Sequence, residues 1–239
     1  MIKLFKKIKK KMFGLTSEEY LEDIRKKGAR IGHHVQIYDT NNIMVDCTRP
    51  YLLEIGDYTK ITRGCIILTH DYSLSVLRRK YGEWIGEGGV TRIGENCFLG
   101  MNSIILMGTS IGNNCIIGAG SVVSGVFPDN VVIAGNPAKI IKRLDVHYLH
   151  RKEKTIAEAK ECARRYFEIY GKLPKPRDLD GFKWLFAPRS KDALIDMNLY
   201  EFACTGDDPK EVEDTFFESK PVYDSFNDFL ADAGLGGML

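Results

Sequence analysis

Residues 93–105 read IGENCFLGMNSII, and residues 111–123 read IGNNCIIGAGSVV. The second stretch begins at Ile111, eighteen positions after Ile93, and the two carry the same kind of side chain at almost every position. Self-similarity at a fixed spacing is the sequence signature of a repeat architecture. The fold therefore depends on the shape of one repeat and on how successive repeats stack.

The repeat has a finer period of six. Every sixth residue from Ile93 is aliphatic, and a small residue stands four positions after each. The aliphatic positions are Ile93, Leu99, Ile105, Ile111, Ile117 and Val123, and the small ones are Cys97, Ser103, Thr109, Cys115 and Ser121, with Phe127 ending the second series. Helices repeat at about 3.6 residues and strands at about 2, so a period of six fits a short strand followed by a corner.

Three such sides return the chain to its start, as from Ile93 to Ile111, which predicts one coil of a solenoid. Parallel strands of successive coils lie ~4.8 Å apart. We therefore expect Ile93 beneath Ile111 and Leu99 beneath Ile117, in an all-β parallel solenoid with an aliphatic interior.

The same register occurs earlier in the chain. Its aliphatic positions are Ile31, Ile37, Ile43, Ile55, Ile61 and Ile67, and its small positions are Val35, Cys47, Thr59 and Cys65. Only Arg49 interrupts the aliphatic series. Counting in eighteens predicts one coil over 37–54 and another over 55–72, after which the pattern resumes out of phase. Residues 73–92 are predicted to leave the solenoid, and such a long loop in a compact repeat is usually functional or disordered.

Length and composition describe an ordinary globular chain. Its 239 residues are 44% hydrophobic, and a net charge of +2 gives no reason to expect nucleic acid as a partner. No apolar run approaches the ~20 residues that span a bilayer, and the lysine-rich start lacks the apolar centre of a secretory signal. We therefore expect a cytoplasmic protein. Residues 1–13 are predicted to form an amphipathic helix, which either packs on the fold or makes weak peripheral contact with a membrane.

Four of the six cysteines fall on the small inward series, at positions 47, 65, 97 and 115. None forms a CxxC pair, so reduced core thiols are the simplest interpretation, and we expect neither a disulfide nor a metal site. Cys162 and Cys204 lie outside the repeat and carry no signal.

Three further motifs accompany the repeat: LTHDYS at 68–73, IGAGSVV at 117–123 and AGNPAKIIK at 134–142. With the hexapeptide words they resemble the hexapeptide-repeat acyltransferases, most closely the bacterial O-acetyltransferases of capsule and other surface polysaccharides. The resemblance is strong over about residues 30–145. It implies a left-handed parallel β-helix, use of acetyl-CoA, transfer to a saccharide hydroxyl, and a homotrimer with coenzyme A between the solenoids.

The resemblance assigns general-base catalysis to His70, because LTHDYS is similar to the family's catalytic histidine segment. Histidine suits this role since its pKa lies near neutrality. His70 is expected at a corner where side chains point outward. Asp71 falls on a small inward position, where it would either orient His70 or bond exposed backbone; we favour the second role. The backbone amide of Met101 is the candidate oxyanion donor.

The coenzyme site is expected along the later coils and the turn after them. Small residues let the pantetheine arm approach the backbone closely, and lysines can meet the phosphates. The candidate coenzyme residues are Gly100, Gly118, Ala119, Gly120, Ser124, Asn136, Pro137, Ala138, Lys139 and Lys142. Many relatives read VVTKDVP where this chain reads VVSGVFP, so one clamp lysine is absent. The two remaining lysines are either phosphate ligands or solvated surface charge.

The acceptor site is expected at the excursion, because nearly identical coils cannot easily encode a particular sugar. Aromatic faces can stack on sugar rings, and polar groups can meet hydroxyls. The candidate acceptor residues are Tyr72, Ser73, Tyr81, Glu83, Trp84 and, on a coil, Phe98. The alternative is that the loop covers coenzyme A and the aromatic C-terminal segment selects the acceptor.

Three parts are predicted: a basic helical segment at 1–30, the β-helix at 31–145 and a helical extension at 146–239. The extension should contain a helix ending before LPKP, a second starting at Asp208 and a third over 225–234, with aromatics packing helices against the solenoid. Alternative functions are N-acetylation of an amino sugar, O-acetylation of a xenobiotic, and a non-catalytic scaffold. A zinc carbonic anhydrase on the same solenoid would need histidines that the coils around His70 lack.

Overall fold

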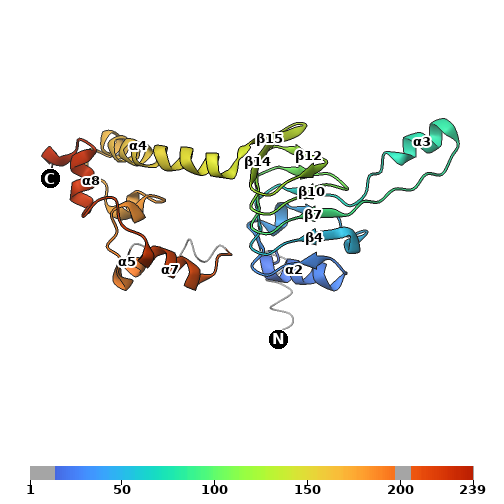
Figure 1. Ribbon diagram of the computed structural model, residues 1–239, viewed down its shortest axis with the longest axis horizontal. Coiled ribbons are helices and arrows are strands. Elements are labelled where there is room, and N and C mark those ends of the chain that lie inside the picture. The colour runs from blue at the N-terminus through green and yellow to red at the C-terminus, as the bar shows by residue number, and fades with distance from the viewer. Residues whose placement is uncertain (1–13, 197–205, 239) are drawn as a thin grey trace. The chain divides into compact units, whose positions relative to one another are not determined.

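The computed structural model describes residues 14–196 and 206–238. The chain forms two compact units, one ending at His147 and the other beginning at Tyr148 (Figure 1). The predicted helix at 1–13 and Cys204 lie outside the described residues. All the predicted catalytic, coenzyme and acceptor residues belong to the first unit.

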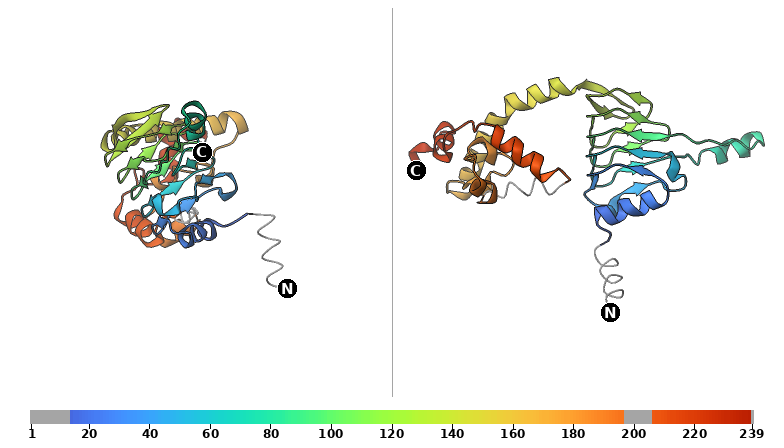
Figure 2. Two further views of the ribbon diagram at one scale, coloured as in Figure 1. Left: turned by 90° about the vertical axis from the view of Figure 1, so that its right-hand side faces the viewer. Right: turned by 60° about the horizontal axis from the view of Figure 1, so that its bottom comes forward.

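The first unit is a left-handed parallel β-helix whose coils stack as three sheets (Figures 1 and 2). The first sheet contains β1 (Arg30–Ile31), β4 (Leu53–Ile55), β7 (Thr91–Ile93), β10 (Ser110–Ile111) and β13 (Val126–Phe127). The second contains β2 (Gln36–Ile37), β5 (Lys60–Ile61), β8 (Phe98–Leu99), β11 (Ile116–Ile117), β14 (Val131–Gly135) and β15 (Ala138–Arg143). The third contains β3 (Met44–Val45), β6 (Ile66–Ile67), β9 (Ile104–Ile105) and β12 (Val122–Val123). All neighbours are parallel except β14 and β15, which are antiparallel.

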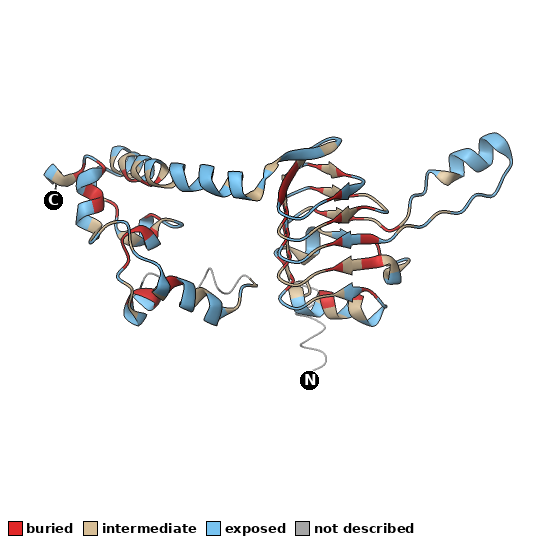
Figure 3. Cartoon of the chain, in the orientation of Figure 1, coloured by how far each residue is buried: buried red, intermediate tan, exposed pale blue. Residues whose placement is uncertain are grey.

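The interior is filled by the aliphatic series, as the repeat predicts (Figure 3). Ile93 pairs with Ile111, and Leu99 pairs with Ile117. All four side chains are at most 1% exposed. Burying one aliphatic side chain contributes about 1.5–3 kcal/mol, and this repeated burial stabilises strands that are mostly two residues long. The small series also faces inward, although Cys47 is only half-buried.

The first coil is longer than the repeat predicts. Ile37 pairs with Ile61, whereas counting in eighteens would place Ile55 there. Two short 3-10 helices lengthen the corners of this coil, η1 (Thr40–Asn42) and η2 (Pro50–Leu52). As a result Val45, and not Ile43, lies beside Ile67. The predicted coil over 37–54 is therefore wrong, whereas the next coil does begin at Ile55, which stacks on Ile93.

The last coil is shorter than the others. Phe127 pairs with Ile111, whereas a coil of the usual length would bring Asp129 to that place. Phe127 therefore occupies an aliphatic position, and its predicted place in the small series is wrong.

The predicted excursion is present between β6 and β7. Ile93 stacks directly on Ile55, so the intervening residues leave the coil without disturbing the register. The excursion carries helix α3 (Leu74–Tyr81), none of whose residues is buried. In Figure 1, α3 stands at the far end of two extended legs.

Helix α2 (Ser17–Lys26) covers the N-terminal end of the β-helix. It begins with a capping box in which the Thr16 hydroxyl accepts from the Glu19 N–H and the Glu19 carboxylate accepts from the Thr16 N–H. Leu21 and Ile24 face the first coil and are 0% and 2% exposed. The helix thus closes one end of the aliphatic interior.

The second unit is helical and has its own core. Its elements are α4 (Leu144–Tyr170), which starts in the first unit, then η3 (Pro176–Asp178), η4 (Lys183–Leu185), α5 (Lys191–Asp196), α7 (Pro209–Glu218), α8 (Phe226–Asp232) and η5 (Gly236–Met238). Asp208 caps α7 as predicted, accepting from the N–H of Lys210. Phe186 and Phe229 are buried with ring centroids 5.3 Å apart, so aromatics build this core. None of the described helices is long and apolar enough to cross a membrane.

Candidate active site

His70 lies where the chain leaves the β-helix. After β6, Thr69 is still fully buried, whereas Asp71 is exposed. The chain returns at Thr91, whose hydroxyl donates to the carbonyl oxygen of Leu68 at 2.6 Å. Both legs of the excursion therefore start from one edge of the β-helix, between the third and first sheets.

The imidazole of His70 is held by a buried carboxylate. Its Nδ1–H donates to Oδ2 of Asp46, which is 4% exposed, and Oγ1 of Thr48 lies 3.1 Å from the same nitrogen. The His70 side chain is only 11% exposed, so this corner position is covered by its neighbours. Because a carboxylate only accepts, Nδ1 carries a proton, so in the neutral ring the lone pair is on Nε2. Nε2 is buried without a hydrogen-bond partner among the described residues.

Two threonines fix Asp46 with four further hydrogen bonds. Oδ1 accepts from the N–H and hydroxyl of Thr48 at 2.9 and 2.8 Å, and Oδ2 accepts from the N–H and hydroxyl of Thr69 at 3.0 and 2.5 Å. Burial alone would raise the pKa of Asp46, but the hydrogen bonds from Thr69, Thr48 and His70 hold that pKa well below its usual range. Asp46 is therefore a fixed anion that orients the His70 ring.

The repeat pattern does not predict a role for Asp46. Constant counting in sixes places Ile43 where Val45 lies, so residue 46 reads as an ordinary corner position. The available signal was DCT at 46–48, directly before the break at Arg49. An acid and a hydroxyl two positions apart can bond each other and the local backbone.

Asp71 is exposed, so its predicted inward position is wrong. Its two oxygens accept from the N–H and the hydroxyl of Ser73, both at 2.8 Å. The bond from the Ser73 N–H is the main reason that the pKa of Asp71 is lowered. Asp71 thus closes a turn at the start of the excursion, and Asp46 is the carboxylate that orients His70.

The acceptor candidates divide between the base and the tip of the excursion. At the base, Tyr72 lies edge-on to His70 with ring centroids 4.3 Å apart, and it is 76% exposed. Tyr81 ends α3, and Glu83 and Trp84 follow it. Because α3 stands away from the coils (Figure 1) and Arg78 of α3 lies 4.6 Å from the centroid of the Trp84 ring, the expectation that Tyr81 and Trp84 lie next to His70 is wrong within one chain, and Glu83 lies between these two in sequence.

The coenzyme candidates include a track of small residues on another edge. Gly100, Gly118 and Ala134 directly follow residues paired in β8, β11 and β14, so they stack on successive coils, and Lys139 pairs with Ala134. A Cβ on Gly100 would lie 2.6 Å from the backbone nitrogen of Ala119, and one on Gly118 would lie 2.8 Å from the Cβ of Ala134. Close coil packing therefore requires these glycines. The track is a stack of small residues, of which Gly100 is buried and Gly118 and Ala134 are half-buried, and it ends at a lysine.

Met101 and Gly120 lie beside this track. Met101 is 56% exposed, and its carbonyl accepts from the N–H of Gly120 at 2.8 Å. Gly120 has a φ of +68° with open space around its Cβ position, so a side chain there would be strained even though it would clash with nothing. Ala119, between Gly118 and Gly120 in the sequence, is exposed.

The other coenzyme candidates lie on or near the β14–β15 hairpin. Asn136 and Pro137, joined by a cis peptide bond, form its turn. Ala138 packs against the core, and Lys142 is half-buried on β15. Ser124 follows β12 and is exposed.

One chain does not bring His70 to the track. His70 lies on the edge between the third and first sheets, and Gly100 and Gly118 lie on the edge between the second and third. The face between these edges is the third sheet, whose outward positions are all apolar: Met44, Ile66, Ile104 and Val122. Phe98 points outward from the second sheet and is 41% exposed.

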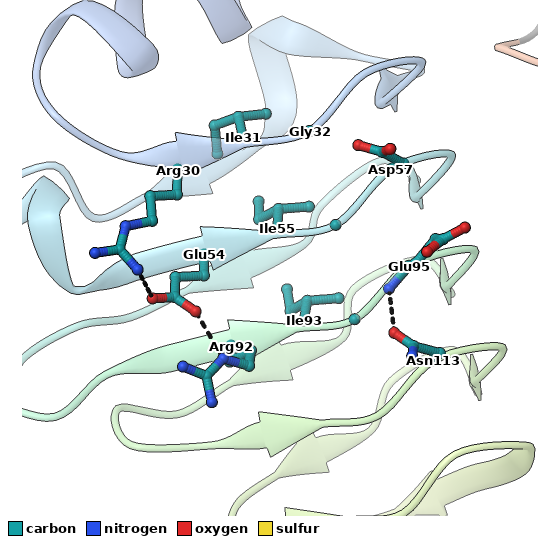
Figure 4. Close-up of a pocket in the computed structure, with 12 residues that line it drawn as sticks. Arg30, Ile31, Gly32, Glu54, Ile55, Asp57, Arg92, Ile93, Glu95 and Asn113 are labelled. Atoms are coloured by element: carbon teal, nitrogen blue, oxygen red, sulfur yellow. Dashed lines mark hydrogen bonds and ion pairs between the residues drawn. The ribbon is translucent and has the colours of Figure 1, made fainter.

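A shallow groove of about 540 Å³ runs along the first sheet (Figure 4). Glu54 bridges Arg30 at 2.8 Å and Arg92 at 2.6 Å, and the bond from Arg92 is the main reason that the pKa of Glu54 is lowered. These charges satisfy one another, and no histidine, cysteine or serine of the described chain lines the groove. His70 is therefore the stronger candidate for catalysis. Within 14–196 and 206–238, no three His, Cys, Asp or Glu residues are grouped to hold a metal ion.

Comparison with known proteins identifies the family to which this β-helix belongs. Residues 90–124 match the hexapeptide repeat of succinyl-transferase. The chain is 43% identical over 141 residues to Protein CapG of Staphylococcus aureus, covering 59% of this chain and 81% of that protein. It is 36% identical over 146 residues to a Dictyostelium discoideum protein named as an acetyltransferase, covering 59% of this chain and 74% of that protein.

Solved structures are similar over part of the chain. A maltose O-acetyltransferase from Clostridium difficile is 29% identical, with a TM-score of 0.37, over 58% of this chain and 83% of that one. A serine acetyltransferase from Neisseria gonorrhoeae is 27% identical, with a TM-score of 0.38, over 48% of this chain and only 38% of that one. The chain belongs to the hexapeptide-repeat acyltransferase family. It is an acetyltransferase of that family, so the predicted family and fold class are confirmed.

Proposed function

We propose that this protein transfers acetyl from acetyl-CoA to a saccharide hydroxyl in the cytoplasm, with His70 as general base. The observation that carries the proposal is the Nε2 atom of His70, which no described residue bonds, backed by the buried carboxylate of Asp46. A ring nitrogen with a free lone pair and a fixed anion on the opposite side is the arrangement that a general base needs.

The proposed reaction uses the two ring nitrogens in different ways. Acetyl-CoA, when bound, supplies an activated thioester carbonyl. A hydroxyl within hydrogen-bond reach of Nε2 gives its proton to that atom as the hydroxyl oxygen attacks the carbonyl carbon. His70 then carries a positive charge, which Asp46 stabilises through Nδ1–H. The proton passes from Nε2 to the departing thiolate, so the pair returns to its starting state.

The track of small residues fits the pantetheine arm of acetyl-CoA. Gly100 is buried and Gly118 is half-buried, so the exposed backbone beside the track is that of Ala119 and Gly120, and Lys139 and Lys142 on β15 supply positive charge for phosphate groups. The N–H of Met101, beside the start of the track, is the proposed hydrogen-bond donor to the thioester oxygen.

The proposed site needs two copies of the chain, because His70 and the track lie on different edges. The apolar face of the third sheet lies between those edges, and Met44 on it is 53% exposed. We propose that other copies cover this face in a homotrimer, in which the track of one copy meets His70 of the next. Cyclic symmetry then gives three equal sites.

The base of the excursion is the proposed acceptor site. The rings of Tyr72 and His70 are perpendicular to each other, and Tyr72 is 76% exposed, so much of its ring is open to stack on a sugar. The tip residues Tyr81, Glu83 and Trp84 are proposed to act on the site of a neighbouring copy.

The test compares His70→Ala with His33→Ala, a change at an exposed histidine on a coil corner. Acetyl transfer is measured by release of free thiol over a panel of saccharides and amino sugars, and acetyl-CoA affinity by calorimetry. His70→Ala should lower turnover by ~100-fold or more, with affinity unchanged within about twofold, and His33→Ala should match the wild type. Near-normal turnover of His70→Ala rules out the base, and acetylation of amines alone rules out the hydroxyl acceptor.

A further inference from the structure

Arg49, the only break in the aliphatic series of the early coils, contacts the excursion. Its Nη1–H donates to the backbone carbonyl of Glu87, on the leg that returns to the β-helix. A Cβ on Gly88 would lie 3.0 Å from the same nitrogen and 3.5 Å from Cδ1 of Leu52. The returning leg therefore packs closely on Arg49 and Leu52.

Glu87 in turn holds the leaving leg. Its Oε1 accepts from the backbone N–H of Asp71, the residue that follows His70. Glu87 is half-buried, and this bond joins residues that are 16 positions apart. One carboxylate thus ties the two legs together next to the candidate base.

A single short segment holds both the ring and the legs. Asp46 and Thr48 contact the His70 imidazole, and Arg49, the next residue, holds the returning leg. If the backbone at His70 moves away from Asp46, the bond between Asp71 and Glu87 has to stretch. The two legs can move away from the β-helix as a unit only if the bond between Arg49 and the carbonyl of Glu87 breaks.

We propose that Arg49 and Glu87 are positioning residues, which latch the base of the excursion and keep the His70 imidazole aligned with Asp46. Neither side chain touches the reacting atoms. The effect on catalysis rests on the proposed function, in which His70 is the base. A displacement of ~1 Å in a catalytic group can cost ~100-fold in rate. Each variant removes only one of several bonds at the foot of the excursion. We therefore expect the loss of either residue to lower kcat about tenfold.

The kinetic test uses Glu87→Ala, Arg49→Ala and Glu87→Gln. The two alanine variants should lower kcat about tenfold and leave KM for acetyl-CoA and acceptor within about twofold. Glutamine keeps an acceptor oxygen at the same place, so Glu87→Gln should recover most of the activity. Glu95→Ala, which removes an exposed carboxylate from a coil corner, is the matched control and should be neutral.

An NMR measurement separates the latch from the proposed function. The Nδ1 proton bonded to Asp46 should give a far-downfield resonance, which His70→Ala removes. Both alanine variants should broaden this resonance by faster exchange with water, while the melting temperature stays within a few degrees. If those variants do not fold, Arg49→Lys, which keeps the charge and loses the fork, should still lower kcat about threefold and broaden the signal.

The outcomes are distinct. A resonance that stays sharp in the variants overturns the latch, whatever happens to kcat. Variants that broaden the resonance support the latch even if His70→Ala is fully active, a result that would overturn only the general-base function. Unchanged kcat in Glu87→Ala and Arg49→Ala, with His70→Ala inactive, overturns the latch alone.

Discussion

Replacing Asp46 by asparagine tests the candidate site most directly. The change keeps the size of the side chain and replaces one acceptor oxygen by an NH₂ group, which donates. Asp46 accepts five hydrogen bonds, two at Oδ1 and three at Oδ2. Whichever way the amide turns, its NH₂ group faces a backbone N–H, that of Thr48 or that of Thr69, and this N–H loses its partner.

The cost to stability can be worked from these contacts. A buried donor without a partner costs ~1–3 kcal/mol, and a hydrogen bond to a charged group contributes ~1.5–3 kcal/mol. The threonine hydroxyls can rotate toward other acceptors. The loss of unfolding free energy therefore comes mainly from the unpaired backbone N–H and from the lost charge. We expect Asp46→Asn to lower the free energy of unfolding by ~3 kcal/mol.

The cost to activity depends on the proton of His70. If the new NH₂ group faces Nδ1, the ring must carry its proton on Nε2, and the proposed base is blocked. If the amide oxygen faces Nδ1, the ring is oriented but its positive charge has no counter-charge. A general base contributes ~100 to 10,000-fold, so we expect kcat to fall by at least ~100-fold in either case.

Urea unfolding at one fixed protein concentration measures stability, because association shifts the apparent value. Free-thiol release measures kcat. Asp57→Asn is the matched control, since Oδ1 of Asp57 accepts from the N–H of His33 at 2.8 Å and an amide oxygen can do the same. The control should cost less than ~1 kcal/mol and leave kcat unchanged. A kcat of Asp46→Asn within about threefold of the wild type would refute the reasoning.

The thiols, the apolar face and the ionised carboxylate each give a further expected outcome. The buried thiols are Cys65, Cys97 and Cys115. They should react with a maleimide far more slowly than exposed Cys162, as measured by site-resolved mass spectrometry. Fast labelling of all of them would contradict the inward register. Light scattering should give three chains per particle, and Ile104→Glu on the third sheet should reduce this to one; a fully active wild-type monomer would show that the site is not shared. Because the pKa of Asp46 is lower in the folded chain than in the unfolded one, its stabilising effect is complete above ~pH 4 and is lost as pH falls through the folded value. Urea unfolding should therefore show the wild type losing more stability than Asp46→Asn between ~pH 5 and ~pH 3, and equal losses would count against the assignment.

The stacking of the later coils could be predicted from the sequence because the interior admits one cross-section. Ile93 and Ile111 are in register since no other alignment fills that interior equally well. The length of a corner could not be predicted in the same way. A corner faces solvent, so extra residues there cost little closure entropy, and the aliphatic series does not show how many have been inserted. The inserted η1 and η2 are of this kind, and η1, which precedes β3, shifts Asp46 into the site.

The candidate site was predictable only where a local motif marks it. His70 stands in LTHDYS, which resembles a known segment, whereas Asp46 acts on it from 24 positions away. Glu87 likewise acts across the two legs of the excursion. Such contacts depend on where the legs meet, and legs without periodicity offer no pattern from which to place them. The position of α3 was missed for the same reason.

The breaks in the repeat are where this fold can hold chemistry. A repeat position supplies an aliphatic or small residue to a fixed interior, so a charged group there would be buried without a partner. The lengthened corner at 46–52 and the excursion at 73–92 fall on the same edge of neighbouring coils. The polar groups of the corner and of the excursion bond each other, because His70 donates to Asp46 and Arg49 donates to the carbonyl of Glu87. A histidine beside a single break would lack a buried counter-charge, so the coincidence of two breaks, more than the histidine alone, locates the site.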